Sequence, residues 1–181
     1  MEATASLAED HRIIELMLPG LERMAGQFEA GEFVRGYDVG RVLEFVREFI
    51  DGYHHGKEER VLFPALAARG VPQDSGLLME LVREHGEARR CVAIMTAGMS
   101  EAIGEDPGAE ADFAEYGREY VALLRRHIEK EDRELRQVAE AALTEEDDAR
   151  LAQSYAEIER EMIGEGGREK FREVAEGVGG S

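Results

Sequence analysis

Cysteine, tryptophan and long apolar runs are what this sequence has least of. Its 181 residues contain one cysteine and no tryptophan. A single cysteine excludes an internal disulfide framework and fits a reducing compartment. No run approaches the roughly 20 apolar residues that a membrane-spanning helix needs, and the N-terminus lacks the basic and apolar regions of a signal peptide. We therefore expect a cytoplasmic protein without a membrane span.

Basic residues are also scarce. The chain has 22 Lys and Arg against 40 Asp and Glu, which gives a formal net charge of -18. Neutralising nucleic-acid phosphates requires clustered Lys and Arg, so the composition argues against a nucleic-acid partner and against binding to an anionic membrane surface. Charge runs are usually solvated helix faces, so the informative acids are those that depart from this rule.

No segment shows sustained period-two alternation bounded by turn signals, so the sequence does not support a sheet. Apolar residues instead recur with the period of amphipathic helices. The expected helices span about residues 7–28, 39–68, 77–102, 110–143 and 144–163. Long helices with short connections favour an all-α fold, an antiparallel up-down-up-down four-helix bundle with an additional short C-terminal helix. We expect the bundle to occupy residues 1–143 and a helical extension packed on it to occupy residues 144–181.

Local signals indicate where these helices start and stop. Ser6, followed by an acid three residues later, matches a helix-capping box, and Pro19 predicts a kink or a break in the first helix. Gly70 is placed to end the second helix, and Thr144 opens another capping box. We expect the glycine-rich end of the chain, residues 177–181, to be frayed.

The chain also repeats a motif. The segments 54–62 and 127–135 both read His-x-x-Lys-Glu-acid-Arg-x-Leu, and an acid-His pair precedes each of them, at His11 and at His85. A lone histidine on an apolar face is more often an inert core residue, but four of the five histidines in matched frames favour a built site. Two such helical hairpins related by pseudo-two-fold symmetry bring four histidines and two glutamates together in the bundle core.

Helical angles decide which side chains of the motif face inward. With about 100° per residue, His54 and Glu58 share the apolar face, whereas His55 and Glu59 turn away toward the rim or solvent. A carboxylate on a core face is costly unless it is paired, hydrogen-bonded or bound to a metal. Glu58 and its counterpart in the repeat, Glu131, therefore need a cation.

The predicted ligands are four imidazoles and two carboxylates: His11, His54, Glu58, His85, His127 and Glu131. This donor set has no thiolate, so it disfavours an iron–sulfur cluster or structural zinc and fits iron or manganese. Six protein ligands are too many for one zinc and suit two irons, with each glutamate able to bridge both. We therefore expect two iron ions as cofactors, in preference to manganese or zinc.

Five further side chains lie around the predicted ligands. Glu15 and Arg89 each follow a predicted histidine ligand by four residues, and we expect them to pair with each other or with a ligand. Tyr116 and Tyr120 lie on the metal face, where they either donate a hydrogen bond to bound oxygen or fill the core. Glu134 is expected to face inward and to accept a hydrogen bond.

Taken together, these motifs resemble the hemerythrin-like family of non-haem di-iron proteins, the HHE cation-binding domains. The resemblance covers roughly residues 9–132 and rests on Asp10-His11, Tyr53-His-His-Gly-Lys-Glu-Glu59, Leu62-Phe-Pro64, Glu84-His85 and His127-x-x-Lys-Glu-Asp132. It implies a left-handed four-helix bundle and a pair of irons bridged by oxo or hydroxo and by carboxylates. It also implies that the six residues named above are the ligands.

One position departs from the family pattern. The oxygen-carrying hemerythrins have a second histidine one turn after the third-helix histidine, and this chain has Arg89 there. With one imidazole fewer, each iron keeps an open position, which suits peroxide or nitric oxide bound across both irons better than reversible carriage of O2 on one. We therefore expect redox chemistry on reactive species, catalase-like or peroxidase-like if the protein is an enzyme.

Two other functions stay open on the sequence alone. One is a module that senses O2, nitric oxide or the iron level, which would require a protein partner because no signalling segment is attached. The other is storage or donation of iron without catalysis. For a redox role and for a sensing role alike, we expect the site to bind a small ligand (O2, H2O2 or NO). The sequence does not decide between a monomer and a homodimer.

Overall fold

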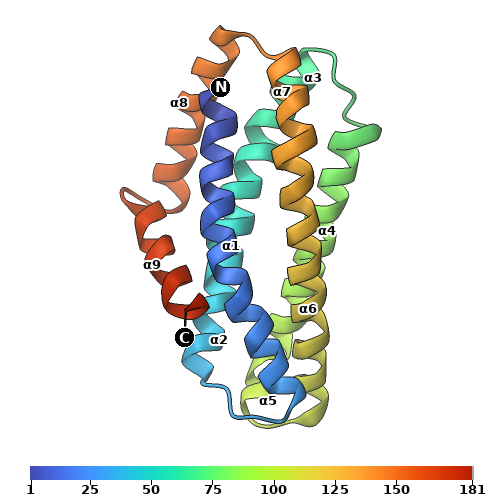
Figure 1. Ribbon diagram of the computed structural model, residues 1–181, viewed down its shortest axis with the longest axis vertical. Helices are drawn as coiled ribbons and strands as arrows, with labels where there is room; N and C mark the ends of the chain where they lie inside the picture. The colour runs from blue at the N-terminus through green and yellow to red at the C-terminus, as the bar shows by residue number, and fades with distance from the viewer. Residues whose placement is uncertain (181) are drawn as a thin grey trace.

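Four long helical runs stand side by side in the computed structural model, which describes residues 1–180 (Figure 1). The first run is α1 (Glu2–Glu29). The second run comprises α2 (Gly36–Phe45), the π-helical segments η1 (Val46–His55) and η2 (Glu58–Leu62), and α3 (Phe63–Ala68); the third comprises α4 (Gly76–Ala97) and α5 (Met99–Ile103); the fourth comprises α6 (Pro107–Lys130), the π-helical η3 (Glu131–Leu135) and α7 (Arg136–Ala142). The predicted all-α bundle is confirmed, and no strand occurs within the described residues.

Most helix ends lie where the sequence predicts them. Gly70 follows α3 with φ +89°, a left-handed conformation that glycine adopts without a steric penalty. The Thr144 hydroxyl accepts a hydrogen bond from the backbone N–H of Asp147, whose carboxylate accepts one from the backbone N–H of Thr144, so the predicted capping box is confirmed. The predicted start of the first helix is wrong, because α1 already includes Ser6. Pro19 does not break α1, although the helix changes direction along its length in Figure 1.

Two C-terminal helices, α8 (Glu145–Met162) and α9 (Gly167–Gly179), cover one side of the bundle. α8 packs along α1, η1 and η2, and α9 packs on α1 and α2 (Figure 1). A Cβ on Gly20 would lie 2.6 Å from Cγ1 of Val178, so the missing side chain allows α9 to approach α1 closely. The prediction of a frayed end is wrong for Gly177 and Gly179, which are helical. Ser181 lies outside the described residues.

The apolar core is divided into two clusters. Along α1 the boundary between them falls between Leu7 and Ile13, and along the fourth run it falls between Ile128 and Leu135. The motif residues lie at this boundary, so the repeat places polar side chains between two apolar halves of the core. None of the described helices is both long and apolar enough to cross a bilayer.

Candidate metal centre

The boundary between the two apolar clusters is occupied by the six predicted ligands, which we call the centre. They come from all four helical runs: His11 from α1, His54 from η1, Glu58 from η2, His85 from α4, His127 from α6 and Glu131 from η3. Each is at most 3% exposed. Because apolar residues enclose the centre on both sides, a charge in it needs a partner.

Three π-helical segments shape the centre. Glu58 and Glu131 each open one of them, and His54 and His55 end the third. A π-helix closes its hydrogen bonds from i to i+5, so each turn contains more residues than in an α-helix and consecutive side chains diverge less. The prediction that His55 faces the rim or solvent is therefore wrong: its side chain is buried beside His54, with 1% exposed.

Glu131 joins the two halves of the chain. Its two carboxylate oxygens lie 3.0 Å from Nε2 of His11 and 3.0 Å from Nε2 of His127, and Nε2 of His54 is 3.7 Å away. Each oxygen of this carboxylate faces a different imidazole. A carboxylate that bridges two cations has this position.

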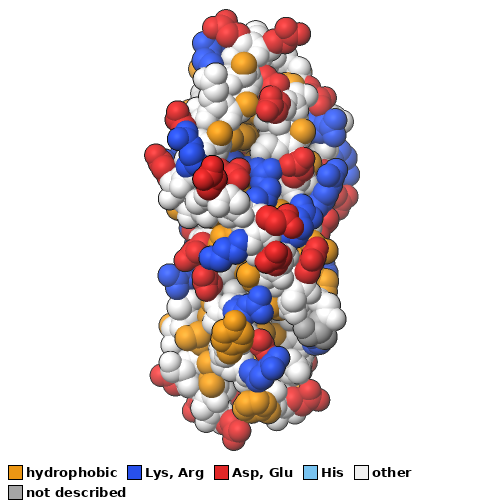
Figure 2. All heavy atoms as spheres, turned by 90° about the vertical axis from the view of Figure 1, so that its left-hand side faces the viewer, with side chains coloured by type: hydrophobic (Ala, Val, Ile, Leu, Met, Phe, Trp, Pro, Cys, Tyr) orange, Lys and Arg blue, Asp and Glu red, His pale blue; other side chains and the backbone are white. Residues whose placement is uncertain are grey.

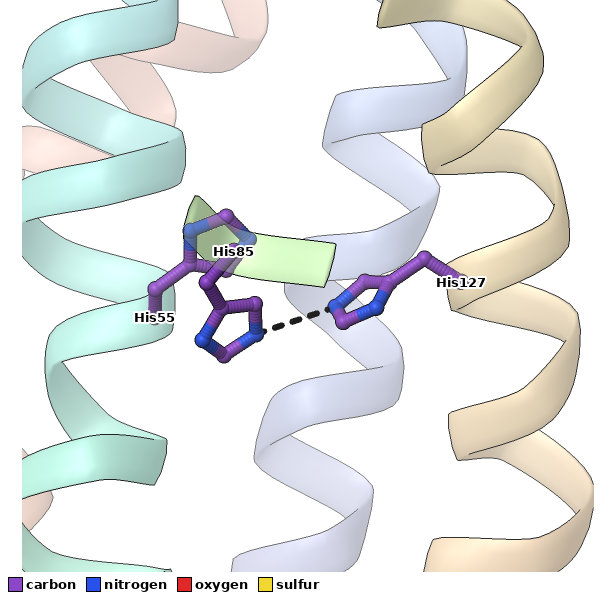
Figure 3. Close-up of side chains that lie close together, drawn as sticks. All are labelled: His55, His85 and His127. Atoms are coloured by element: carbon purple, nitrogen blue, oxygen red, sulfur yellow. Dashed lines mark hydrogen bonds between the residues drawn. The ribbon is translucent and has the colours of Figure 1, made fainter. Parts of the chain in front are cut away.

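Glu58 lies on the other side of the centre with no hydrogen-bond partner among the described residues. Its carboxylate is fully buried, and one oxygen lies 3.3 Å from Nε2 of His85 without hydrogen-bond geometry. Nε2 of His85 in turn lies 3.1 Å from Nε2 of His127, and the two rings point toward each other (Figure 3). A buried carboxylate without a donor, next to two converging ring nitrogens, is an arrangement that a cation would stabilise.

Three groups of potential ligand atoms meet the spacing of a metal site. Glu58, His85, His127 and Glu131 offer atoms that all lie within 4.8 Å of one another, and so do His11, His54 and Glu131, so Glu131 belongs to both of these groups. The third group is His55, His85 and His127. The donors are nitrogen and oxygen without sulfur, as iron and manganese prefer. The residues therefore fit a pair of such ions that share Glu131.

Each imidazole of the centre also has a carboxylate on its outer nitrogen. Nδ1 of His11 lies 2.7 Å from Asp132, and Nδ1 of His85 lies 2.7 Å from Glu59. Because a carboxylate only accepts hydrogen bonds, Nδ1 carries the proton and Nε2 is left to face the centre. Such an outer carboxylate fixes the orientation of a ligating imidazole and raises its basicity.

The other two histidines also have a carboxylate near Nδ1, and each of these carboxylates is paired with a lysine. Nδ1 of His127 lies 2.8 Å from Glu84, which also accepts from Nζ of Lys130 at 2.5 Å. Nδ1 of His54 lies 3.5 Å from Asp10, which forms an ion pair with Lys57. Asp10 and Lys57 are both fully buried. Burial would raise the pKa of Asp10, but Lys57 and His54 hold it below its usual value, so this carboxylate stays ionised.

The carboxylates also set the pKa values of the imidazoles in the metal-free protein. Burial would lower the pKa of His11, but hydrogen bonds to Asp132 and Glu131 outweigh burial and raise it to about 10. Burial is likewise outweighed for His127, whose pKa rises to about 10 beside Glu131 and Glu84. Without metal, protons therefore occupy the space between imidazole and carboxylate that a cation would take.

His55 packs by its ring face, and its Nε2 has no hydrogen-bond partner in the described part of the chain. Its ring stacks on His85 with centroids 3.8 Å apart, as Figure 3 shows, and Nδ1 lies 3.4 Å from Asp51. A cavity of about 550 Å³ opens beside it between η1 and α4. The cavity has mainly apolar walls and one ion pair, formed by Val46, Ala88, Val92, Tyr120, Asp51 and Arg89. It is the side from which a small molecule can approach His55.

The five side chains predicted around the ligands have mixed outcomes. Glu15 is exposed and does not pair with Arg89, which donates instead to Asp51 at 2.6 Å and to Glu59 at 2.8 Å. Tyr120 is buried at the cavity, whereas Tyr116 is half-buried beneath the guanidinium of Arg90. The prediction that Glu134 faces inward is wrong, because in η3 it is exposed and pairs with Arg133.

The outer carboxylates Asp10, Glu59, Glu84 and Asp132 were not singled out by helical angles. The signal for them was the repeat itself, since each is the acid next to a predicted ligand in one of the matched motifs. Glu59 was predicted at the rim, and its side chain is indeed 29% exposed, yet it contacts His85.

Comparison with known proteins places this geometry in context. The family model described as the hemerythrin HHE cation binding domain matches residues 2–139, which include the whole centre and its outer carboxylates. No curated protein and no solved structure matches the chain.

Proposed function

Since the chain belongs to the hemerythrin HHE cation-binding family, we propose that the centre holds two iron ions and acts on hydrogen peroxide or nitric oxide. The observation that carries the proposal is the shared position of Glu131 between His11 and His127, with Nε2 of each 3.0 Å from its carboxylate. His11 and His54 would hold one ion and His85 and His127 the other, with the two glutamates between them.

The chain's own residues prepare this centre in three ways. The outer carboxylates keep a proton on Nδ1 of His11, His85 and His127, so the Nε2 lone pairs of these imidazoles are available to a cation. The two apolar clusters keep the centre dry, which strengthens charge interactions within it. The mainly apolar cavity beside His55 gives a small neutral molecule a place to approach the interior of the bundle.

Hydrogen peroxide is the substrate whose reaction needs the fewest components besides this protein and its ions. A pair of irons held by the predicted ligands would supply the two-electron redox chemistry that this reaction needs. In disproportionation, two hydrogen peroxide molecules yield one dioxygen and two water molecules, so neither an external reductant nor a second protein is needed. Reduction of nitric oxide would require an electron donor, so for nitric oxide we propose binding.

The test is anaerobic reconstitution with Fe(II), followed by a metal count and by exposure to peroxide, nitric oxide and O2. About two irons per chain and evolution of O2 from peroxide are expected, with Glu58→Ala lacking both. Binding of a single zinc in place of two irons would contradict the di-iron centre. A stable, repeatedly reversible complex with O2 and no peroxide turnover would contradict the peroxide activity but not the centre.

A further inference from the structure

The C-terminal helices α8 and α9 lie beyond residues 2–139, the part that matches the family model. They cover the face of the bundle drawn in Figure 2, where acidic and basic side chains are interspersed. One basic side chain of this extension, Arg168 in the first turn of α9, is only 23% exposed and points into the bundle.

Arg168 contacts both long helices that carry the first half of the repeat. Its guanidinium donates to the hydroxyl of Tyr53 at 2.7 Å, to the carboxylate of Glu9 at 2.7 Å and to the hydroxyl of Ser6 at 3.2 Å. Its Nε lies 3.4 Å from Oδ1 of Asp10. An arginine with this many partners has a fixed position, since several acceptors hold its planar fork of donors at once.

Asp10 is the link from Arg168 to the centre. Its other oxygen, Oδ2, forms the ion pair with Lys57 and lies 3.5 Å from Nδ1 of His54. The carboxylate is therefore held from two sides by cations, and its orientation decides whether it reaches His54.

In the described part of the chain, the second half of the repeat has no arginine from the extension next to its equivalent carboxylate, Glu84. There Glu84 contacts His127 and is paired with Lys130, whose remaining partner is the surface acid Glu80. The pseudo-two-fold symmetry of the centre is thus broken by the extension, which contributes a cation to the side of His11 and His54 only.

We propose that Arg168 is a positioning residue for the metal centre, through which docking of the C-terminal helices fixes Asp10 against His54 and completes one of the two ion sites. This inference rests on the proposed function, because it concerns ions that the centre is proposed to hold. Release of α9 frees Asp10 to turn wholly toward Lys57, and one ion is then held less tightly. Coupling is reciprocal, so loading of the ions also tightens the docking of α9.

The experiment is an anaerobic titration of the full chain with Co(II), whose visible spectrum reports ligand geometry. Arg168→Met is expected to weaken binding of one of two ions by about 10- to 100-fold, the range for loss of an outer partner, and to change its spectrum. Arg168→Lys keeps the charge and should restore part of the affinity. The matched control is Arg172→Met, one turn further along α9, where Arg172 lies 3.5 Å from Glu169 of the same helix.

Two further measurements separate positioning from simple folding. In the unmodified protein, hydrogen exchange in α9 should slow on loading with Co(II), a result that needs no variant to fold. In a cycle with Asp10→Asn, the effects of Arg168→Met and Asp10→Asn should be less than additive if both act through His54. The inference fails if Arg168→Met and Arg172→Met bind both ions equally well. It also fails if the rate of hydrogen exchange in α9 is the same with and without Co(II). If the unmodified protein does not bind two ions, it is the proposed function that fails.

Discussion

Nδ1 of His85 lies 2.7 Å from the carboxylate of Glu59, and the same distance separates Nδ1 of His11 from Asp132. Glu59 and Asp132 occupy equivalent positions in the repeat, immediately after the predicted ligands Glu58 and Glu131. Each half of the chain therefore supplies the acid that orients a histidine of the other half.

Glu59→Gln tests this exchange directly. The amide keeps the shape of the side chain but removes the charge that fixes the proton on Nδ1 of His85, so metal affinity should fall by about 10- to 100-fold. Competition titration with a chromophoric chelator measures the change. Glu134→Gln, at an exposed acid in the equivalent segment of the other half, should bind metal like the unmodified protein. Equal affinities for all three proteins would show that Glu59 has no such role.

Glu58→Met should separate stability from metal binding. Glu58 is fully buried without a hydrogen-bond partner among the described residues. A buried carboxylate without a hydrogen-bond donor costs free energy in the folded state, so the metal-free variant should unfold at higher urea concentration. It should also fail to bind two ions. The exposed Glu129 provides the control, Glu129→Met, which should change neither property. A metal-free Glu58→Met less stable than the unmodified protein would count against this reading.

His55 is expected to contribute packing and not ligation. His55→Ala removes a ring stacked on His85 and should destabilise the protein by about 2–4 kcal/mol, while the metal count is retained. His55→Phe restores an aromatic ring and should recover most of that loss. Thermal unfolding and metal analysis of both variants decide the matter. Loss of one ion from His55→Phe would identify His55 as a ligand and correct the predicted set.

The raised pKa values of His11 and His127 predict a pH dependence of the metal-free protein. Each rises from 6.5 to about 10 on folding, so its stabilising contribution is complete below pH 6.5 and is lost as the pH rises toward 10. Metal uptake at pH 8 should release protons, because a ligating imidazole must lose its Nε2 proton. Calorimetry in buffers of different ionisation enthalpy counts those protons. The double variant His11→Gln/His127→Gln should release fewer on mixing with metal, and uptake without proton release in the unmodified protein would contradict the assignment.

Gly20→Ala tests the close approach of α9 to α1. The added Cβ would lie 2.6 Å from Cγ1 and 2.8 Å from the backbone oxygen of Val178. Relieving the second contact requires a shift of the α9 backbone, which costs free energy. We expect a loss of about 1–3 kcal/mol and faster hydrogen exchange in α9. Gly40→Ala is the control, because a Cβ there has no neighbour within 4 Å and alanine favours the helix. A Gly20→Ala protein as stable as Gly40→Ala would show that the two helices are not so tightly apposed.

The bundle could be predicted from the sequence because the signals for it are local or repeated. Apolar periodicity and the glycine at position 70 located the runs, and the matched motifs brought four histidines and two glutamates to one level. Whether these six bind metal stays a prediction, as does the division of the chain at residue 143.

What the sequence did not predict depends on packing. Three π-helical segments shift the angles of Glu134 and His55, and no local propensity records such an inserted residue. The end of α9 looked frayed because of its glycines, but Gly179 is needed there since a Cβ would lie 2.0 Å from the backbone oxygen of Leu16. Only the neighbouring helix reveals that requirement.

The exchange of acids between the two halves has a consequence for synthesis of the chain. His11 leaves the ribosome early, while Asp132, which orients it, leaves only with the fourth helical run. A nascent chain that has completed the first hairpin still lacks both Glu131 and that acid. A metal ion bound before the last run emerges would meet an incomplete set of the predicted ligands, so the order of translation would delay metal capture until the bundle can close.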